Sequence, residues 1–258
     1  MKIFIIGAGH MGSWLTEELC HDHEVAVFDK DPRRLKYFIN VKRCMSIEEV
    51  KDFKPDMVIN CVSLQKTTEV FDSLLPLVPG ACMLSDIASV KNGLHDYYKK
   101  TGKRFVSTHP MFGPTFGNVR NLSNESAIII NESDPEGKKF FNNLFQSLKL
   151  SIYNYSFEEH DEITAYSLST PFASSLVFAA CMKKIDAPGT TFKKHMEIAK
   201  GLLSEDDYLL SEILFNPYTL RQIESINSQL SYLSHIIKGR DFEEMEKFLH
   251  KLRDNIKQ

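Results

Sequence analysis

The sequence predicts an α/β fold with a mainly parallel sheet in its first part and only helices in its second. Short apolar runs alternate with helix-length stretches up to about residue 155, and the runs are continuous, as in strands that are covered on both faces. Repeated strand–helix–strand patterns require crossover connections and therefore parallel strands. No strand pattern follows Phe157. We therefore divide the chain into residues 1–155 and a helical domain over residues 156–258.

The composition is that of an ordinary globular protein. The chain has 258 residues, of which 43% are hydrophobic and 25% charged, and its formal net charge is −3. This balance excludes a disordered chain and argues against a nucleic-acid or membrane-surface binder. No apolar run approaches the ~20 residues of a membrane-spanning helix. The five cysteines are scattered without C-x-x-C spacing, so we expect reduced thiols in a cytoplasmic protein and no metal site.

The elements of the first part follow from apolar runs and helix start signals. Ile3–Ile6 is the first expected strand and Met11–Leu19 the first helix, and Pro32 suits the first turn of a second helix. Pro135–Leu148 is the last helix of this part. The further expected strands are Glu24–Phe28, Met57–Val62, Cys82–Ser85, Arg104–Ser107, Ala127–Ile130 and Leu150–Tyr153.

The second part contains helical patterns alone. Residues 174–180 are apolar on nearly all sides, which is typical of a helix that is buried all round. A unit of about a hundred residues buries such a helix poorly by itself, so we expect a packed neighbour or a homodimer through the helical domain. The expected helices are Glu158–Lys184 with an interruption at Pro171, Phe192–Leu203, Asp206–Phe215, Thr219–Lys238 and Phe242–Lys257.

A glycine-rich motif, G-A-G-H-M-G over residues 7–12, lies between the first strand and the first helix. In this position Gly7 allows a tight turn, Gly9 lets the backbone approach a pyrophosphate, and Gly12 permits close helix–strand packing. The helix N-terminus offers free N–H groups and a partial positive charge to the phosphates. The motif predicts a Rossmann-type dinucleotide-binding domain.

An acidic residue stands at the expected distance from this motif. Asp29 ends the second strand, 22 residues after Gly7, where a carboxylate accepts hydrogen bonds from ribose hydroxyls and repels a 2′-phosphate. We therefore expect NAD as the cofactor, with NADP as the alternative because Lys30, Arg33 and Arg34 follow closely. The residues assigned to the cofactor are Gly7, Gly9, His10, Met11, Gly12, Asp29 and Ser63.

Two further motifs follow later strands. Ser89, in S-D-I-A-S-V-K, is placed either to cap the next helix or to lie beside the nicotinamide. His109, in S-T-H-P-M-F-G-P, follows the next strand in a loop that Pro110 and Pro114 stiffen. An imidazole has an unperturbed pKa of about 6.5 and can take a proton as hydride leaves, so His109 is the candidate for acid–base work.

The ordered set of motifs resembles the prephenate and arogenate dehydrogenases of tyrosine biosynthesis. The resemblance rests on G-A-G-H-M-G, D-I-A-S-V-K and H-P-M-F-G-P, and it continues through His160-Asp161 to Asn216. It implies NAD-dependent oxidative decarboxylation of prephenate to 4-hydroxyphenylpyruvate, in a short form without a regulatory domain. His109 matches the family's catalytic histidine, which accepts the hydroxyl proton, and Ser89 matches the serine near that histidine and the cofactor. The residues assigned to the substrate are Ser89, His109, Thr115 and Arg221.

Two departures from the family pattern concern the substrate carboxylates. Many members have a histidine after the proline of the long helix, where this chain has Phe172, and an arginine in a stretch that here reads Leu210-Ser211-Glu212-Ile213. Arg221 is its equivalent only in another register, so we expect a different substrate anchor. His160 and Asp161 lie in an acidic run that we interpret as the first turn of a helix rather than as a catalytic pair.

Three other functions stay open at this point. An arogenate dehydrogenase would give tyrosine directly, and Phe172 in place of histidine leaves this choice open. A non-catalytic NAD/NADH sensor would use the same nucleotide site without turnover. A hydroxy-acid dehydrogenase of the same two-part architecture would carry a lysine on the long helix, but Lys183 and Lys184 come late in it.

Overall fold

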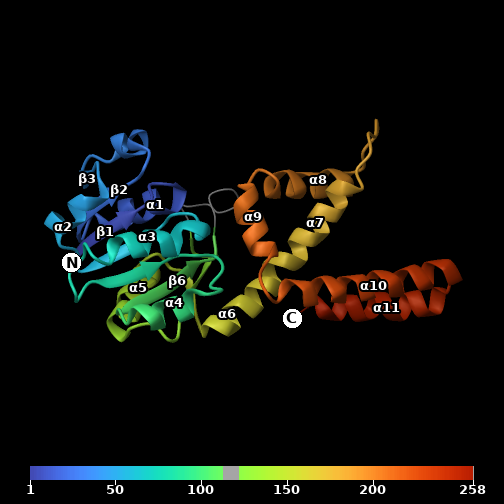
Figure 1. The fold of residues 1–258 in the computed structure, drawn as a ribbon. Coiled ribbons are helices and arrows are strands. Elements are labelled where there is room, and N and C mark those ends of the chain that lie inside the picture. The colour runs from blue at the N-terminus through green and yellow to red at the C-terminus, as the bar shows by residue number, and fades with distance from the viewer. Residues whose placement is uncertain (113–121, 258) are drawn as a thin grey trace.

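The computed structural model describes residues 1–112 and 122–257. Thr115, which we assigned to the substrate, and Pro114 of the third motif lie outside the described residues. An α/β domain forms the first part of the chain, and an extended helical domain forms the second (Figure 1). The last strand ends at Tyr155 and the first helix of the second part begins at Phe157.

One eight-stranded sheet runs through the α/β domain in the order β3-β2-β1-β4-β5-β6-β7-β8. Neighbouring strands are parallel except for β6 and β7. The order 3-2-1-4-5-6 is that of dinucleotide-binding sheets, whose ligands bind where the order reverses, here between β1 and β4. The predicted fold class is confirmed. The strands are β1 (Lys2–Ile6), β2 (Glu24–Phe28), β3 (Lys42–Cys44), β4 (Met57–Asn60), β5 (Met83–Asp86), β6 (Phe105–Pro110), β7 (Ser126–Ile130) and β8 (Ser151–Tyr155).

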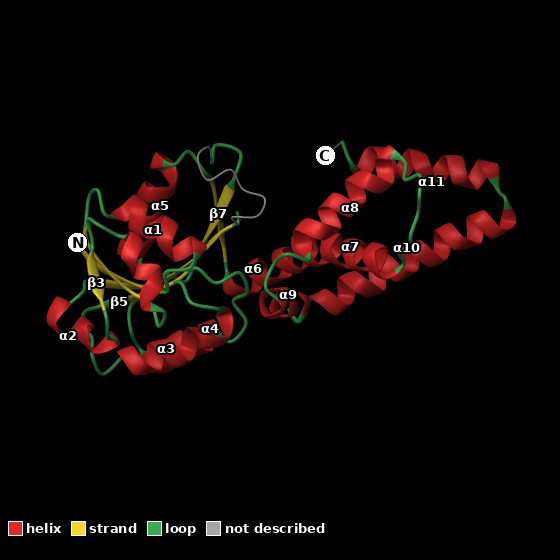
Figure 2. Ribbon diagram, turned by 90° about the horizontal axis from the view of Figure 1, so that it is seen from above, coloured by secondary structure: helices red, strands yellow, loops and turns green. Residues whose placement is uncertain are grey.

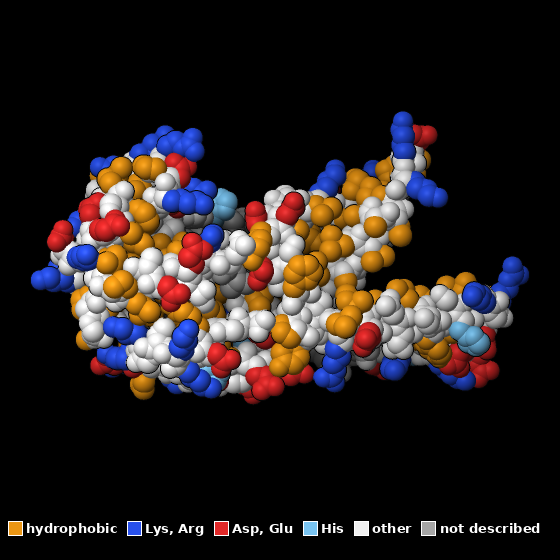
Figure 3. All heavy atoms as spheres, viewed as in Figure 1, with side chains coloured by type: hydrophobic (Ala, Val, Ile, Leu, Met, Phe, Trp, Pro, Cys, Tyr) orange, Lys and Arg blue, Asp and Glu red, His pale blue; other side chains and the backbone are white. Residues whose placement is uncertain are grey.

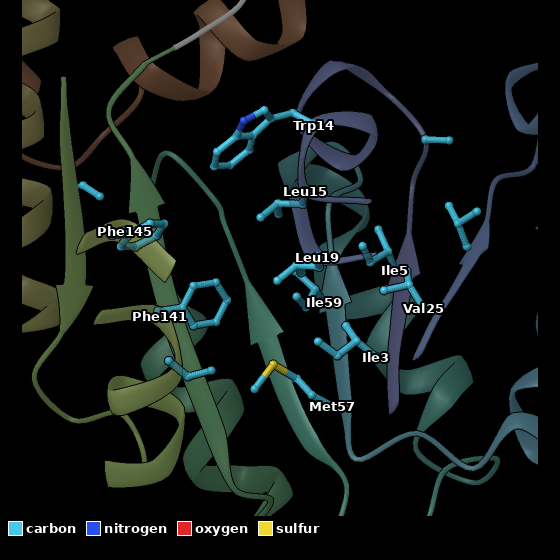
Figure 4. Close-up of a cluster of buried hydrophobic side chains, with 14 of the residues drawn as sticks. Ile3, Ile5, Trp14, Leu15, Leu19, Val25, Met57, Ile59, Phe141 and Phe145 are labelled. Atoms are coloured by element: carbon cyan, nitrogen blue, oxygen red, sulfur yellow. The ribbon is translucent and has the colours of Figure 1, made fainter. Parts of the chain in front are cut away.

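Helices cover both faces of this sheet (Figure 2). α1 (His10–Leu19) and α5 (Pro135–Ser147) pack on one face, in a cluster that contains Ile3 and Ile5 (Figure 4). The intervening Phe4 and Ile6 point to the other face, which the remaining helices cover. Burial on both faces is the reason why the strands read as continuous apolar runs. The helices of the other face are α2 (Val50–Phe53), α3 (Thr67–Leu74) and α4 (Leu94–Thr101). The short 3₁₀ helices are η1 (Pro32–Tyr37), whose Leu35 joins the cluster on the α1 face, η2 (Ile47–Glu49) and η3 (Leu64–Lys66).

Three local features of this domain differ in detail from what the sequence suggests. β3 was missed because it has only three residues and two of them are exposed, so it carries no apolar run. The element that begins at Pro32 is a 3₁₀ helix, capped by the Asp31 side chain, rather than an α-helix. Ser89 does not cap the next helix, because α4 begins only at Leu94 and follows Gly93.

The second part begins with one continuous helix made of α6 (Phe157–Thr164), the π-helical segment η4 (Ala165–Ser169) and α7 (Thr170–Ala180). At the predicted interruption the helix does not break. It is π-helical over Ala165–Ser169 and continues as an α-helix through Pro171. Proline has no N–H for the carbonyl four residues earlier, and a π-helical segment accommodates that gap. The remaining helices are α8 (Thr190–Leu202), α9 (Asp207–Leu214), α10 (Thr219–Gly239) and α11 (Phe242–Asn255).

The helical domain ends in two pairs of helices, which we call its arms. α7 with α8 forms one arm and the antiparallel pair α10 and α11 forms the other (Figure 1). The helix over Phe157–Ala180 is long and apolar enough to cross a membrane by length and composition, with a mean hydropathy of 1.2. Its first half, however, buries His160, Asp161 and Ser169 within the protein, which a lipid-facing helix would not do.

Candidate active site

The glycine-rich loop lies at the carboxyl end of β1, against the loop that follows β4. Gly7 has a φ of +93°, which favours glycine, and a Cβ there would lie 2.8 Å from the Cys61 carbonyl oxygen. A Cβ on Gly12 would lie only 1.8 Å from the Gly7 carbonyl oxygen. Both positions therefore require glycine, as the motif predicted.

The N-terminus of α1 is suited to a dinucleotide pyrophosphate. Gly9 is the N-cap residue and supplies no side-chain cap, so the first N–H groups of the helix are left for another acceptor. A Cβ on Gly9 would meet only Arg34 Nη1, at 3.7 Å, so the backbone faces open space. His10 is exposed in the first turn, and Met11 packs against the hydrophobic cluster behind it. The residues present therefore fit the cofactor.

Asp29 closes the other side of this loop. Its Oδ2 accepts a hydrogen bond from Ala8 N at 2.7 Å and its Oδ1 accepts one from Asp31 N at 2.8 Å. A carboxylate offers about four acceptor positions, so ribose hydroxyls can still bind to it. Arg33 pairs with Asp31, whereas Arg34 Nη1 lies 3.8 Å from Asp29 Oδ2. Arg34 is thus the basic side chain that lies beside the predicted ribose site.

The loops that follow four neighbouring strands meet in one hydrophobic cluster. It joins Ala8 after β1, Cys61 after β4, Ile87 after β5 and Phe112 after β6. The Phe112 ring meets the Trp14 indole of α1 edge-on, with ring centroids 5.2 Å apart and an interplanar angle of 88°. The residue that follows β6 by two positions therefore packs against α1, the helix that begins at the dinucleotide loop. Ser63, also assigned to the cofactor, is exposed in the loop after β4 at this same edge.

The prediction that His109 lies in a loop was wrong: His109 is the penultimate residue of β6, which continues to Pro110, and its exposed fraction is 5%. Its Nδ1 lies 2.9 Å from His160 Nε2, and its Nε2 has no hydrogen-bond partner among the described residues. Burial lowers the pKa of His109 well below its usual value, and His160 and Lys91 lower this pKa further. The ring is therefore neutral at pH 7 and can accept a proton at Nε2.

Ser89 lies in the loop between β5 and α4 and is half-buried. Within the described part of the chain its hydroxyl has no hydrogen-bond partner, and the partner of His109 is His160 instead. Among the described residues no hydrogen bond therefore joins Ser89 to His109. The free hydroxyl at the carboxyl end of β5 is available to a bound ligand.

His160 and Asp161 lie next to His109, which their acidic neighbours in the sequence did not indicate. Glu158 and Glu159 are exposed in the first turn of α6, as expected, but the next two side chains are buried against the α/β domain. His160 Nδ1 lies 2.8 Å from Asp161 Oδ1, and the same oxygen accepts a hydrogen bond from Lys91 N at 2.8 Å. Burial lowers the pKa of His160 to about 3 and raises the pKa of Asp161 to about 6. At pH 7, His160 is neutral and Asp161 is ionised.

The sequence does contain a signal for the orientation of α6 that buries His160 and Asp161. Ser156 and Glu159 form a reciprocal capping box, which fixes where α6 begins and hence which way its residues face. Asn216, which carried part of the family resemblance, donates from Nδ2 to the Asp161 carbonyl oxygen at 2.9 Å. The start of α6 is therefore held from both sides.

A buried ion pair joins Lys91 and Asp86 next to β6. Lys91 Nζ donates to Asp86 Oδ1 at 2.6 Å and to the Thr108 carbonyl oxygen at 2.7 Å, and the Tyr98 hydroxyl donates to Asp86 Oδ2 at 2.6 Å. Burial lowers the pKa of Lys91 and raises that of Tyr98. The pair ties the loop after β5 to the strand that carries His109.

Arg221 lies elsewhere, on α10. Its side chain is 79% exposed and its Nη1 lies 3.7 Å from Glu162 Oε1. The hollow around it also contains Glu159, so its surroundings are acidic rather than suited to a carboxylate. In the described residues no contact joins Arg221 to His109, and its substrate role stays a prediction. The described residues also contain no cluster of metal-ligating side chains.

Comparison with known proteins places these features in a family. Residues 15–151, just over half of the chain, match the family "Prephenate dehydrogenase, nucleotide-binding domain". A "Probable arogenate/prephenate dehydrogenase" of Methanocaldococcus jannaschii is 24% identical over 271 aligned residues, which cover 96% of this chain and 59% of the relative. The chain thus spans about three-fifths of the length of that relative.

Two solved structures share the fold over the whole chain. Prephenate dehydrogenase from A. aeolicus, in complex with hydroxyphenyl propionate and NAD+, has a TM-score of 0.85 at 20% identity and covers 99% of this chain and 96% of its own. Synechocystis arogenate dehydrogenase has a TM-score of 0.78 at 16% identity and covers 100% of this chain and 99% of its own. At these identities the likeness establishes the fold.

Proposed function

Because the chain belongs to the prephenate dehydrogenase family, we propose that it oxidises and decarboxylates prephenate to 4-hydroxyphenylpyruvate, with NAD as the oxidant. The observation that carries this proposal is that the dinucleotide loop and His109 lie at the same edge of the sheet. The dinucleotide loop and the β6 end with its neutral His109 are joined there by the contact between Trp14 and Phe112.

The proposed roles follow from the position and protonation of each group. A bound NAD would supply the acceptor for the hydride that leaves the carbinol carbon of the substrate with its electron pair. His109 Nε2 takes the hydroxyl proton, so the carbinol becomes a carbonyl. Carbon dioxide then leaves with cleavage of the ring–carboxylate bond, whose electron pair makes the ring aromatic, and His109 returns its proton to the phenolate oxygen. The reaction therefore has no net proton release, and the protein's task is positioning and temporary proton storage.

The cofactor proposal rests on the glycine loop and on Asp29. Gly7, Gly9 and Gly12 shape the loop around the pyrophosphate, and the Asp29 carboxylate is placed to accept ribose hydroxyls. His10, Met11 and Ser63 line the same edge. Repulsion between Asp29 and a 2′-phosphate supports NAD, while Arg34 beside it is the group that would favour NADP.

An absorbance assay tests the function directly. Protein, NAD and prephenate are mixed and the growth of NADH absorbance is followed, with NADP in place of NAD in a parallel reaction. We expect turnover with NAD and a lower kcat/KM with NADP. If neither prephenate nor arogenate supports NADH formation while NAD still binds, the enzyme proposal is wrong and a nucleotide sensor becomes the better account.

Arogenate is the second candidate substrate. The M. jannaschii relative is named for both substrates, and one of the structural relatives is an arogenate dehydrogenase. Arogenate carries an amine where prephenate has the keto group of its side chain. The protein group that contacts this position therefore distinguishes the two substrates. The ratio of kcat/KM values for the two substrates decides between them.

We further propose a cytoplasmic homodimer formed through the helical domain. Hydrophobic side chains gather over the α7–α8 arm and along α10 (Figure 3). Val177 of α7 is 57% exposed and Ile198 of α8 is 54% exposed. Exposed apolar surface of this extent is typical of an interface, and a second copy of the same arms can cover it symmetrically. The free cysteines support a reducing compartment.

A further inference from the structure

We propose that His160 and Asp161 form a hydrogen-bonded relay that fixes the tautomer of His109, which makes His160 a positioning residue for proton transfer. The inference rests on the proposed function, because it assigns a task to residues behind the proposed base. It is carried by three buried side chains in a row, joined by contacts of 2.9 Å and 2.8 Å.

The proton positions in the relay follow from Asp161, the residue at the end away from His109. The Asp161 carboxylate is an acceptor only, and it already accepts the backbone N–H of Lys91. The nitrogen of His160 that faces this carboxylate, Nδ1, must therefore carry a proton. Since His160 is neutral, its Nε2 has a lone pair and acts as an acceptor.

The same reasoning sets the state of the base. Nδ1 of His109 faces the lone pair of His160 Nε2, so it must be the donor in that contact. A neutral His109 that is protonated on Nδ1 carries its lone pair on Nε2. That nitrogen has no partner among the described residues, so it is the one left for the substrate hydroxyl. Without His160, the proton of His109 would distribute over both nitrogens, and part of the population would be inactive as a base.

The relay also compensates the charge that proton transfer creates. When the substrate O–H bond breaks and an N–H bond forms at His109 Nε2, the ring becomes a cation in a buried site. His109 then keeps its Nδ1–H hydrogen bond to His160, and the ionised Asp161 lies directly behind that ring. A buried cation without such compensation is strongly disfavoured. The arrangement uses the logic of a hydrolase triad, in which a carboxylate orients an imidazole base.

Two substitutions of His160 separate positioning from packing. In His160→Gln the side-chain amide oxygen can still accept from His109 Nδ1, whereas His160→Leu keeps bulk and removes the acceptor. His95→Leu is the matched control, because His95 stacks on Phe157 of α6 with centroids 4.7 Å apart but is outside the relay. We expect His160→Leu to lower kcat on the order of 100-fold with little change in KM. The kcat of His160→Gln should be about tenfold higher than that of the leucine variant. His95→Leu should keep the wild-type kcat.

Equal losses in the glutamine and leucine variants, or a leucine variant with wild-type kcat, would overturn the relay. If the leucine variant does not fold, Asp161→Asn takes its place, since an amide opposite His160 Nδ1 permits the wrong tautomer.

A spectroscopic measurement tests the relay without any substrate. Nitrogen-15 NMR of histidine-labelled protein distinguishes the two neutral tautomers, and the His109 signals are identified by their loss in His109→Asn. We expect His109 and His160 both protonated on Nδ1 in the wild type, with a mixed His109 tautomer in His160→Leu. A His109 ring protonated on Nε2 in the wild type would contradict the inference. Because this result does not depend on turnover, it stays decisive even if no proposed substrate reacts.

Discussion

The ring of Phe112 packs edge-on against the indole of Trp14, with ring centroids 5.2 Å apart. This contact joins the end of the strand that carries His109 to the helix that follows the glycine-rich loop. His109 and the glycine-rich loop, which are far apart in the sequence, are thereby held at one edge of one sheet.

Replacing Gly12 by alanine should abolish NAD binding. The new Cβ would lie 1.8 Å from the Gly7 carbonyl oxygen, so the glycine loop must move away from the position in which it accepts a pyrophosphate. Titration of NAD followed by calorimetry measures the loss. Gly80→Ala is the matched control, since a Cβ there meets no atom within 4 Å. Wild-type affinity in Gly12→Ala would show that the loop does not form the site.

Replacing Lys91 by methionine should lower the free energy of unfolding by about 3–5 kcal/mol, because Asp86 would keep a buried charge without its cation. Urea unfolding at pH 7 measures the change. Lys66→Met removes one partner of the exposed pair with Glu69 and should cost about 1 kcal/mol or less. Similar losses in the two variants would contradict the assigned burial of the Asp86–Lys91 pair.

Acidification should destabilise the wild type more steeply than His109→Asn. The pKa of His109 in the folded protein lies well below its usual value, so between these two values the unfolded chain binds a proton that the native state does not. Its contribution is present above about pH 6.5 and is lost as the pH falls, by up to about 1.4 kcal/mol per pH unit.

Asp161 has the opposite effect, because its pKa is raised to about 6 and the native state gains its proton first. The difference between the two proteins isolates His109, since Asp161 is present in both. Urea unfolding at several pH values between 7 and 5, an interval of about two units, gives the two slopes. Parallel curves would mean that His109 titrates normally in the folded state.

If the proposed homodimer forms through the helical domain, replacing Val177 by aspartate should convert it into a monomer. Val177 lies on the exposed apolar face of α7, where an unpaired charge in a subunit interface is costly. Light scattering after size-exclusion chromatography measures the mass. Ile39→Asp, at a residue that is 90% exposed in the α/β domain, should leave the mass unchanged. A monomeric wild type at micromolar concentration would remove the basis for this interface.

Much of the fold was predictable from the sequence because the information is local. Strands such as β1 and β4 carry continuous apolar runs, and the positions of Gly7 and Gly12 in the glycine loop leave no room for a Cβ. β3 was not predicted because it has no apolar run. Its pairing with β2 is made by the backbone, and Lys42 and Arg43 are exposed to solvent. An exposed edge strand leaves little pattern in the sequence.

The candidate site was predictable only in part. Glycine and aspartate positions of the nucleotide loop follow from local motifs, whereas the neighbours of His109 are set by tertiary packing. His160 follows His109 by 51 positions and lies next to exposed glutamates, so its burial could not be derived from polarity. Its place in the site comes from the rotation of α6, which the Ser156 cap and Asn216 fix.

The turnover of His109→Asn tests the central claim most directly. The asparagine amide can keep a hydrogen bond to His160 while it removes the proton acceptor, so the fold and the nucleotide loop stay in place. NADH formation from NAD and prephenate should fall by a factor of about 100 or more, while calorimetry should give an unchanged affinity for NAD. A variant that turns over at the wild-type rate would contradict the role of His109 as the base.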